Sequence, residues 1–128
     1  MKNLNTIGAL KKFINENNES LFVRWSRGPA MDKKQGNSRD YLNGAVHNGL
    51  SSVEIKKEWT TDDEWLARRI NEYVFLRMKD NLIGCWIYKG EKVGEDSDGY
   101  DLIDNVEPVA KITNKLVNIL QDIKWSEK

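Results

Sequence analysis

Apolar residues recur every three or four positions in three stretches of the chain, the spacing typical of helices with one buried face. These stretches cover residues 7–14, 61–79 and 113–123. Each begins beside a residue that can accept a hydrogen bond from the first turn of a helix. The expected N-terminal caps are Asn5 or Thr6, a capping box made by Thr61 and Glu64, and Thr113 or Asn114. The pattern therefore predicts three amphipathic helices.

Apolar and polar residues instead alternate between Leu21 and Ser26, which is the period of a strand with two different faces. In this alternation Arg24 and Ser26 share one face, and Leu21 lies on the other. Residues 28–43 then carry Gly, Pro, Asp, Asn and Ser with little periodicity, which indicates a long irregular loop. Loops of this length inside small domains are usually functional or mobile.

Further strands are expected over residues 50–55, 85–88 and 109–112. Residues 89–92, with the sequence Lys-Gly-Glu-Lys, resemble a turn that leads into a short strand at Val93. Helices and strands of this kind, without an internal repeat, predict an α+β fold in one domain. We expect a mostly antiparallel sheet with about three helices packed on it.

Composition supports one folded unit, because 128 residues with 39% apolar side chains can bury a single core. The 20 basic and 20 acidic residues cancel, so no overall electrostatic attraction to nucleic acid or to a membrane is expected, and neither is predicted as a partner. The single cysteine, Cys85, cannot form an internal disulfide, and the polar N-terminus lacks the apolar core of a signal peptide. These features favour a cytoplasmic protein.

Charge is nevertheless unevenly distributed along the chain. Residues 23–40 hold five basic and two acidic residues, whereas residues 91–107 hold seven acidic residues and one lysine. Two surfaces of opposite sign are expected. The acidic stretch can equally be a solvated turn region that pairs with the basic loop.

The arginines are the strongest candidates for a ligand site. A guanidinium on a strand face beside a hydroxyl, as Arg24 beside Ser26, is costly to bury unless it meets an acid or an anionic ligand. Arg27 and Arg39 bracket the loop, and their fork geometry suits carboxylate or phosphate. The alternative is structural, with Arg24 or Arg39 pairing to an acidic side chain that orders the loop. The acids considered for that pairing are Asp40, Glu54 and Glu107.

Other chemistry finds less support in the residues. Gly99 follows Asp96 and Asp98 too early for a helix-loop-helix calcium site, so no metal is expected. The only histidine, His47, has no neighbour in sequence that orients it as a base. Cys85 sits in a strand between bulky apolar residues, where a core thiol is more common than a reactive one.

The sequence resembles two groups of known proteins. The stretches 24–29, 38–40, 49–51 and 106–110, read as RWSRGP, SRD, GLS and VEPVA, resemble an uncharacterised family of short bacterial proteins of unknown function. The resemblance extends from Leu21 to about Leu116 and implies no activity.

A more distant likeness is to the ADP-ribosyltransferase architecture, in which an early arginine, a serine and a late glutamate meet around NAD. Arg24, then Ser51 or Ser52, then Glu107 occur in that order. This likeness implies NAD as a possible cofactor and Glu107 as a catalytic residue. The chain departs from that pattern because no second glutamate lies two positions before Glu107.

Two hypotheses follow. In the first, the protein binds a small anionic ligand, a phosphate or a nucleotide, as an ADP-ribosyltransferase-like enzyme would, through Arg24, Ser26, Arg27, Arg39, Ser51 and Ser52. In the second, the protein is a non-enzymatic protein-binding module, such as an inhibitor or regulator encoded by a mobile element. Trp25, Trp59 and Tyr41 would then be candidate anchors. A concave site joining Arg24, Ser52 and Glu107 favours the first hypothesis.

Overall fold

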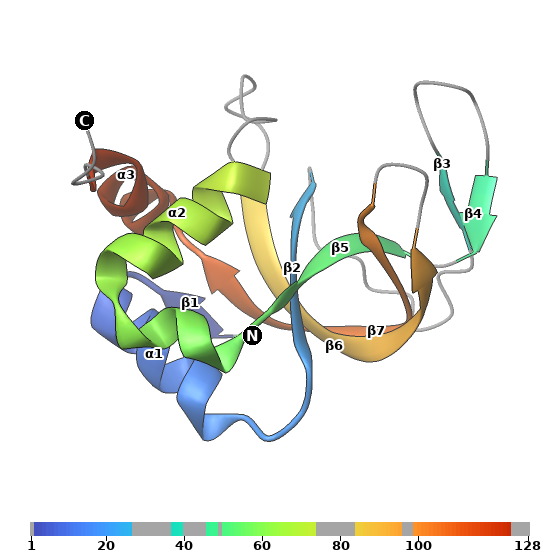
Figure 1. Cartoon of the computed structure of the whole chain (residues 1–128), viewed down its shortest axis with the longest axis horizontal. Helices are drawn as coiled ribbons and strands as arrows, with labels where there is room; N and C mark the ends of the chain where they lie inside the picture. Colours follow the sequence, from blue (N-terminus) through green and yellow to red (C-terminus); the bar gives the residue numbers. More distant parts are fainter. Residues whose placement is uncertain are drawn as a thin grey trace.

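The computed structural model describes residues 2–26, 37–39, 46–48, 50–73, 84–95 and 99–123. Within them the chain forms three α-helices, one 3-10 helix and seven strands (Figure 1). In chain order these are β1 (Lys2–Leu4), α1 (Ile7–Glu16), β2 (Leu21–Ser26), β3 (Asn37–Arg39), β4 (Val46–Asn48), β5 (Leu50–Ile55), η1 (Lys57–Thr61), α2 (Asp63–Tyr73), β6 (Gly84–Glu95), β7 (Asp101–Ile112) and α3 (Asn114–Asp122). The α+β prediction is confirmed.

The main sheet curves until it closes on itself. Its strand order is β1-β7-β5-β2-β6, and β6 also pairs with β7, so four antiparallel strands form a ring. β1 extends the sheet as a parallel neighbour of β7. The two long strands β6 and β7 make the curvature possible, because three register shifts along their pairing bend the ribbon. The small sheet of β3 and β4 stands apart at one end of the molecule (Figure 1).

The three helices cover one face of this sheet and bury its aliphatic side chains. Thr6 caps α1 by accepting a hydrogen bond from the Ala9 amide at 3.1 Å, and Thr113 caps α3 by accepting one from Leu116. The helices then present their apolar stripes to the alternate strand residues. The resulting cluster includes Leu10, Ile14, Leu66, Ile70, Leu116 and Leu120 from the helices and Leu21, Val23, Cys85, Ile87, Ala110 and Ile112 from the strands. This helix-covered face is the main core.

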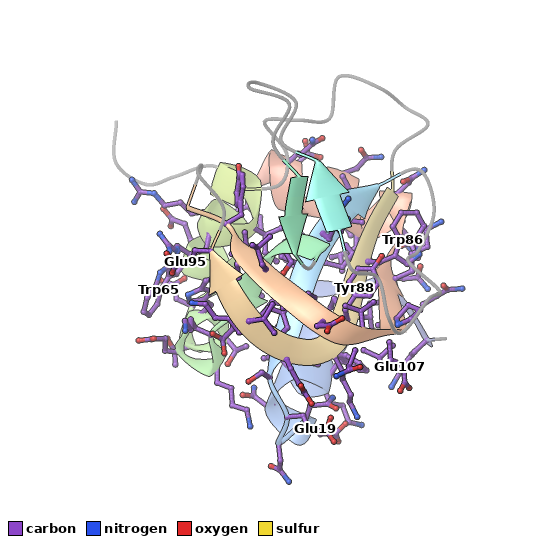
Figure 2. The ribbon with its side chains drawn as sticks, turned by 90° about the vertical axis from the view of Figure 1, so that its right-hand side faces the viewer. Glu19, Trp65, Trp86, Tyr88, Glu95 and Glu107 are labelled. Atoms are coloured by element: carbon purple, nitrogen blue, oxygen red, sulfur yellow. The ribbon has the colours of Figure 1, made fainter. Side chains whose placement is uncertain are left out.

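The other face of the sheet, here called the inner face, carries a second and smaller cluster. It consists of Phe22, Trp86, Tyr88, Ile103 and Val106, which are all buried. Figure 2 shows Trp86 and Tyr88 projecting from the same side of β6. No helix covers this face among the described residues, so the curl of β6 and β7 supplies the burial instead.

Some expected element boundaries are wrong. Residues 89–92 do not turn, because β6 continues unbroken from Gly84 to Glu95 and β7 begins at Asp101 rather than at Val109. The capping box of α2 is not formed either. Asp62 accepts the hydrogen bond from the Glu64 amide at 2.9 Å, whereas the Thr61 hydroxyl donates to the Glu58 carbonyl.

The expected long loop contains the strand β3, and β1 and β4 were not predicted. The expected continuation of α2 to Lys79 lies outside the described residues.

Candidate functional site

β2 and β5 pair only over part of their length, and the point where they separate is the candidate site. Val23 pairs with Val53, and the pairing ends there. β2 continues alongside β6 as far as Ser26, while residues 50–52 of β5 pair with β7 instead. In Figure 1 the two strands cross near the centre of the molecule and then diverge. We call the diverging segments, residues 24–26 and 50–52, the strand fork.

The strand fork holds most of the residues that the sequence assigned to ligand binding. Arg24 and Ser26 lie on its β2 arm, and Ser51 and Ser52 lie on its β5 arm. Arg39 belongs to β3, a strand that contacts β5. Arg27 lies outside the described residues. Positions that are separated by more than twenty residues in the sequence therefore extend from the same strand junction in the fold.

Arg24 shares the inner face with an aromatic ring and a second cation. Its Cα partner on β6 is Trp86, and the partner of Trp86 on β7 is Lys111. The Lys111 ammonium lies 5.4 Å from the centroid of the Trp86 ring, a cation–π arrangement. Arg24 is half-buried and already takes part in an interaction of its own. Two positive charges therefore flank one indole on this face.

Ser52 is a buried hydroxyl on the β5 arm of the fork. It is 4% exposed, and its Oγ donates to the Asp101 carbonyl at 3.3 Å. Because Phe22 pairs with Glu54, the alternation of β5 places Ser52 on the inner face together with Arg24. A ligand held at this point would meet a guanidinium and a hydroxyl from two different strands.

Glu107 occupies another part of the molecule. It is exposed on β7, its Cα partner is Lys89, and Lys89 in turn pairs with Leu21, whose side chain lies on the helix-covered face. Figure 2 shows Glu107 displaced from Trp86 toward the end of the sheet where Glu19 lies. Arg24, Ser52 and Glu107 do not converge in this arrangement, and the catalytic role of Glu107 stays a prediction.

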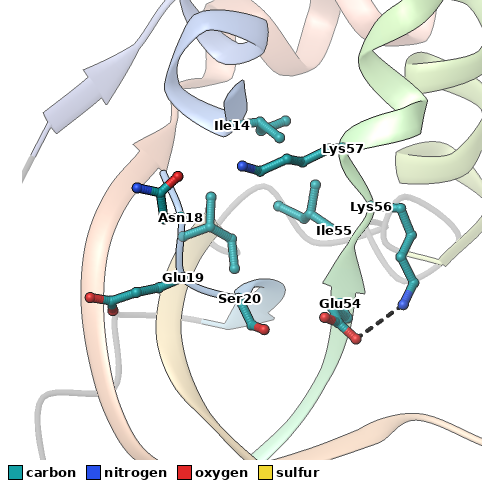
Figure 3. A pocket seen from close by; sticks show the side chains of 9 residues that line it. Ile14, Asn18, Glu19, Ser20, Glu54, Ile55, Lys56 and Lys57 are labelled. Atoms are coloured by element: carbon teal, nitrogen blue, oxygen red, sulfur yellow. Dashed lines mark hydrogen bonds and ion pairs between the residues drawn. The ribbon is translucent and has the colours of Figure 1, made fainter. Parts of the chain in front are cut away.

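Two pockets border the C-terminal end of β5. The first, the edge pocket, has a volume of about 200 Å³ and lies against the β5 edge that faces β7. Its walls are Ser52, Val53, Glu54, Lys56, Trp59, Arg69, Lys92, Gly99, Tyr100 and Asp101. The second, the turn pocket, has about 210 Å³ and is lined by Ile14, residues 18–21 and residues 54–57 (Figure 3). Neither pocket is lined by Arg24 or Glu107.

The edge pocket contains cations that sequence reasoning did not select. Lys56 follows β5, Arg69 is on α2 and Lys92 is on β6. Hydrogen bonds to Asp101 first and to Glu95 second raise the pKa of Lys92 above its ordinary value, so its ammonium stays charged at neutral pH. No local motif links the three residues, because each comes from a different element. Of the predicted ligand-binding residues whose side chains the structure describes, Ser52 lines this pocket and Arg24 does not.

Other reactive groups offer little within the described residues. Burial raises the pKa of the Cys85 thiol, which packs in the main core and stays protonated. The described ranges contain no cluster of His, Cys, Asp and Glu side chains that could hold a metal ion. None of the helices described is long and apolar enough to cross a membrane.

Comparisons with known proteins identify the family and leave the activity open. No curated protein and no solved structure matches the chain. The likeness to ADP-ribosyltransferases therefore gains no support. The model of DUF6098, a family of unknown function, matches residues 1–124. The expectation of an uncharacterised family is confirmed, and the chain belongs to this family of unknown function.

Proposed function

We propose that the protein binds a small anionic ligand, a phosphate or a nucleotide, at the strand fork. One observation carries this proposal: the separation of β2 and β5 after Val23 and Val53 leaves Arg24 and Ser52 on neighbouring arms of the same face. The guanidinium suits an oxyanion because it can donate several hydrogen bonds to it. The Ser52 hydroxyl donates its one hydrogen to the Asp101 carbonyl and would have to release that carbonyl to donate to a ligand.

The surroundings of Arg24 strengthen the attraction for an anion. Lys111 lies on the same face beyond Trp86, so two positive charges act on the same region. The half-buried setting weakens solvent screening and makes each charge count for more than it would on an open surface. Arg24 already takes part in an interaction, and a structural ion pair is the alternative that the experiment must separate from ligand binding.

The protein-binding hypothesis named Trp25, Trp59 and Tyr41 as anchors, but Tyr41 and the side chain of Trp25 lie outside the part of the chain that the structure describes. Trp59, one of the expected anchors, is 3% exposed and packs in the main core. Trp65 on α2 is 38% exposed, but single exposed apolar residues are common on monomeric proteins. A partner surface would need several such residues in one patch.

The test compares Arg24→Lys with Arg24→Ala, using Arg68→Lys on the exposed side of α2 as the matched control. Lysine retains the charge and loses the planar fork, so Arg24→Lys should keep the melting temperature and weaken ligand binding by about tenfold or more. Binding is measured by thermal shift and calorimetry with inorganic phosphate, pyrophosphate, AMP and NAD. A ligand at 100 times its Kd should add about 2.7 kcal/mol to the stability of the parent protein.

A structural ion pair gives the opposite result. Arg24→Ala would then melt early, while every anion that the parent binds would bind the variant with unchanged affinity. That outcome, or the absence of binding by all four anions to the parent protein, would refute the proposal. Arg68→Lys should change neither the melting temperature nor the affinity for the anions.

A further inference from the structure

The turn pocket lies where the turn after α1 passes the C-terminal end of β5. Its floor is apolar, because Ile14 of α1, Leu21 of β2 and Ile55 of β5 line it. These three side chains are buried and belong to the main core, so the packing of the helices on the sheet holds them in place. The floor is therefore formed before any ligand binds, which lowers the cost of binding.

The two carboxylates that line the turn pocket are each matched by a lysine. Glu54 Oε1 accepts a hydrogen bond from the Lys56 ammonium at 3.1 Å. Glu19 Oε2 lies 3.6 Å from the ammonium of Lys89, which comes from β6 and does not line the pocket. In each ion pair one positive charge offsets one negative charge. The acidic side chains therefore leave no negative charge in the pocket without a counterion.

Lys57 is the remaining cation of the pocket lining. Its ammonium has no hydrogen-bond or ion-pair partner within the part of the chain that the structure describes. Figure 3 shows its side chain extending toward Asn18 beneath Ile14, whereas Lys56 turns toward Glu54. The turn pocket thus combines one unmatched positive charge with an apolar floor.

Two neutral donors line the same pocket. The side-chain amide of Asn18 and the hydroxyl of Ser20 belong to the turn between α1 and β2, and neither has a partner among the described residues. An amide offers two N–H donors, a hydroxyl one O–H donor and an ammonium three N–H donors. These donors suit a carboxylate, whose two oxygens accept several hydrogen bonds.

We propose that the turn pocket binds a compact monocarboxylate with a short apolar chain. Lys57 pairs with the carboxylate, Asn18 and Ser20 donate hydrogen bonds to it, and the chain rests on the apolar floor. The volume of about 210 Å³ is below the range of roughly 300–1,000 Å³ usual for drug-sized ligands, so the chain has to be short. This site is separate from the strand fork and does not depend on the function proposed there.

A phosphate dianion suits the turn pocket less well than a monocarboxylate. The unmatched Lys57 offsets only one of its two charges, and the carboxylates of Glu19 and Glu54 repel the other. Phosphate also gains nothing from an apolar floor. The pocket therefore differs from the strand fork in the anion that it selects.

The first experiment titrates the intact protein with isovalerate, acetate and isovaleramide and follows backbone amide signals by NMR. Isovalerate should move the signals of Ser20 and Ile55, which line the pocket. Isovaleramide keeps the branched chain and loses the charge, so it should bind about tenfold more weakly or worse. Acetate keeps the charge and lacks the chain, and its affinity should be lower by about fourfold or more, the effect of one buried CH₂ group.

The second experiment repeats the isovalerate titration with Lys57→Met, which removes the unmatched charge and keeps a flexible chain of similar length. Binding should weaken by about tenfold. Lys12→Met is the matched control, because Lys12 is an exposed lysine on α1 that does not line the pocket. Lys57 is exposed as well, so both variants should melt at the temperature of the parent protein.

Each outcome supports or overturns the proposal. Shifts of Ser20 and Ile55, the expected order of the three ligands and a loss of affinity confined to Lys57→Met support it. The proposal is overturned if isovalerate moves neither amide, or if Lys57→Met and Lys12→Met bind it equally well. It is also overturned if isovaleramide or acetate binds as tightly as isovalerate, because the charge or the floor then plays no part.

Discussion

The two faces of the curved sheet have opposite characters. On the helix-covered face, the buried strand side chains that the structure describes are small or aliphatic, such as Val23, Cys85 and Ile87, and they pack against the three helices. The inner face combines the aromatic rings of Trp86 and Tyr88 with the half-buried Arg24. Because successive strand residues point to opposite sides, the same six residues of β2 contribute to both faces.

This division separates stability from candidate function. A helix packing on a sheet requires a continuous apolar surface, which leaves no room for unpaired polar groups. The inner face meets no helix among the described residues, so it can tolerate charged and hydroxyl-bearing side chains at its margins. The strand fork and Ser52 of the edge pocket lie at those margins. The comparison predicts large stability effects on one face and smaller ones on the other.

The largest effect is expected on the helix-covered face. Leu66 and Ile70 are fully buried on α2, which confirms the helix phase expected from the sequence. Leu66→Ala leaves a cavity in a closely packed core and should lower the free energy of unfolding by about 2–5 kcal/mol. Lys12→Ala on the exposed side of α1 is the control and should change it by less than about 0.5 kcal/mol. Similar urea midpoints for the two variants would contradict this account of the core.

An intermediate effect is expected where the inner face is tightest. The Trp86 ring lies over Gly84, so a Cβ added there would approach the ring to 2.5 Å. Gly84→Ala should therefore force the indole to move and cost about 1–3 kcal/mol. The matched control is Gly8→Ala in α1, where nothing lies within 4 Å. That change should stabilise the protein by about 0.5–1 kcal/mol, because alanine favours the helix.

Chemical denaturation measures both glycine variants, and the indole N–H signal of Trp86 in NMR spectra reports the displacement. Opposite signs of the two stability changes are the expected result. If Gly84→Ala were neutral and the Trp86 signal unmoved, the ring would not rest on the strand as described.

Local patterns in the sequence were enough to predict the elements whose signals agree with the fold. The alternation of residues 21–26 and the apolar stripes of α1 and α3 are examples. Local sequence patterns fail where pairing between strands overrides the conformational preference of the residues. Residues 89–92 have the composition of a turn, yet they stay extended because β7 offers a partner along the whole length of β6. Gly90, which suggested a turn, lies at the register shift between Lys89 and Glu91, so the strand accommodates it without turning.

The candidate site was likewise predictable from the sequence only in part. Arg24 and Ser52 could be selected individually, because a charged residue on an alternating strand and a serine after a turn signal are visible locally. That they meet at one fork depends on where two strands separate, which no local pattern encodes. The edge pocket could not be predicted, since Lys56, Arg69 and Lys92 are assembled from three elements by the tertiary fold.

The smallest loss of stability is expected at the N-terminus of α2, where the structure shows a different cap from the predicted one. Asp62 caps α2, whereas the predicted cap Thr61 donates its hydroxyl to the Glu58 carbonyl within η1. Asp62→Ala should therefore cost about 0.5–2 kcal/mol, typically near 1, by leaving the Glu64 amide without its acceptor. Asp62→Asn retains an acceptor at this position and should recover most of the loss. Thr61→Ala removes only an exposed hydrogen bond at the end of η1, so its cost should be smaller than that of Asp62→Ala. Urea denaturation of the three variants ranks them, and a larger loss for Thr61→Ala would restore the capping box that the sequence suggested.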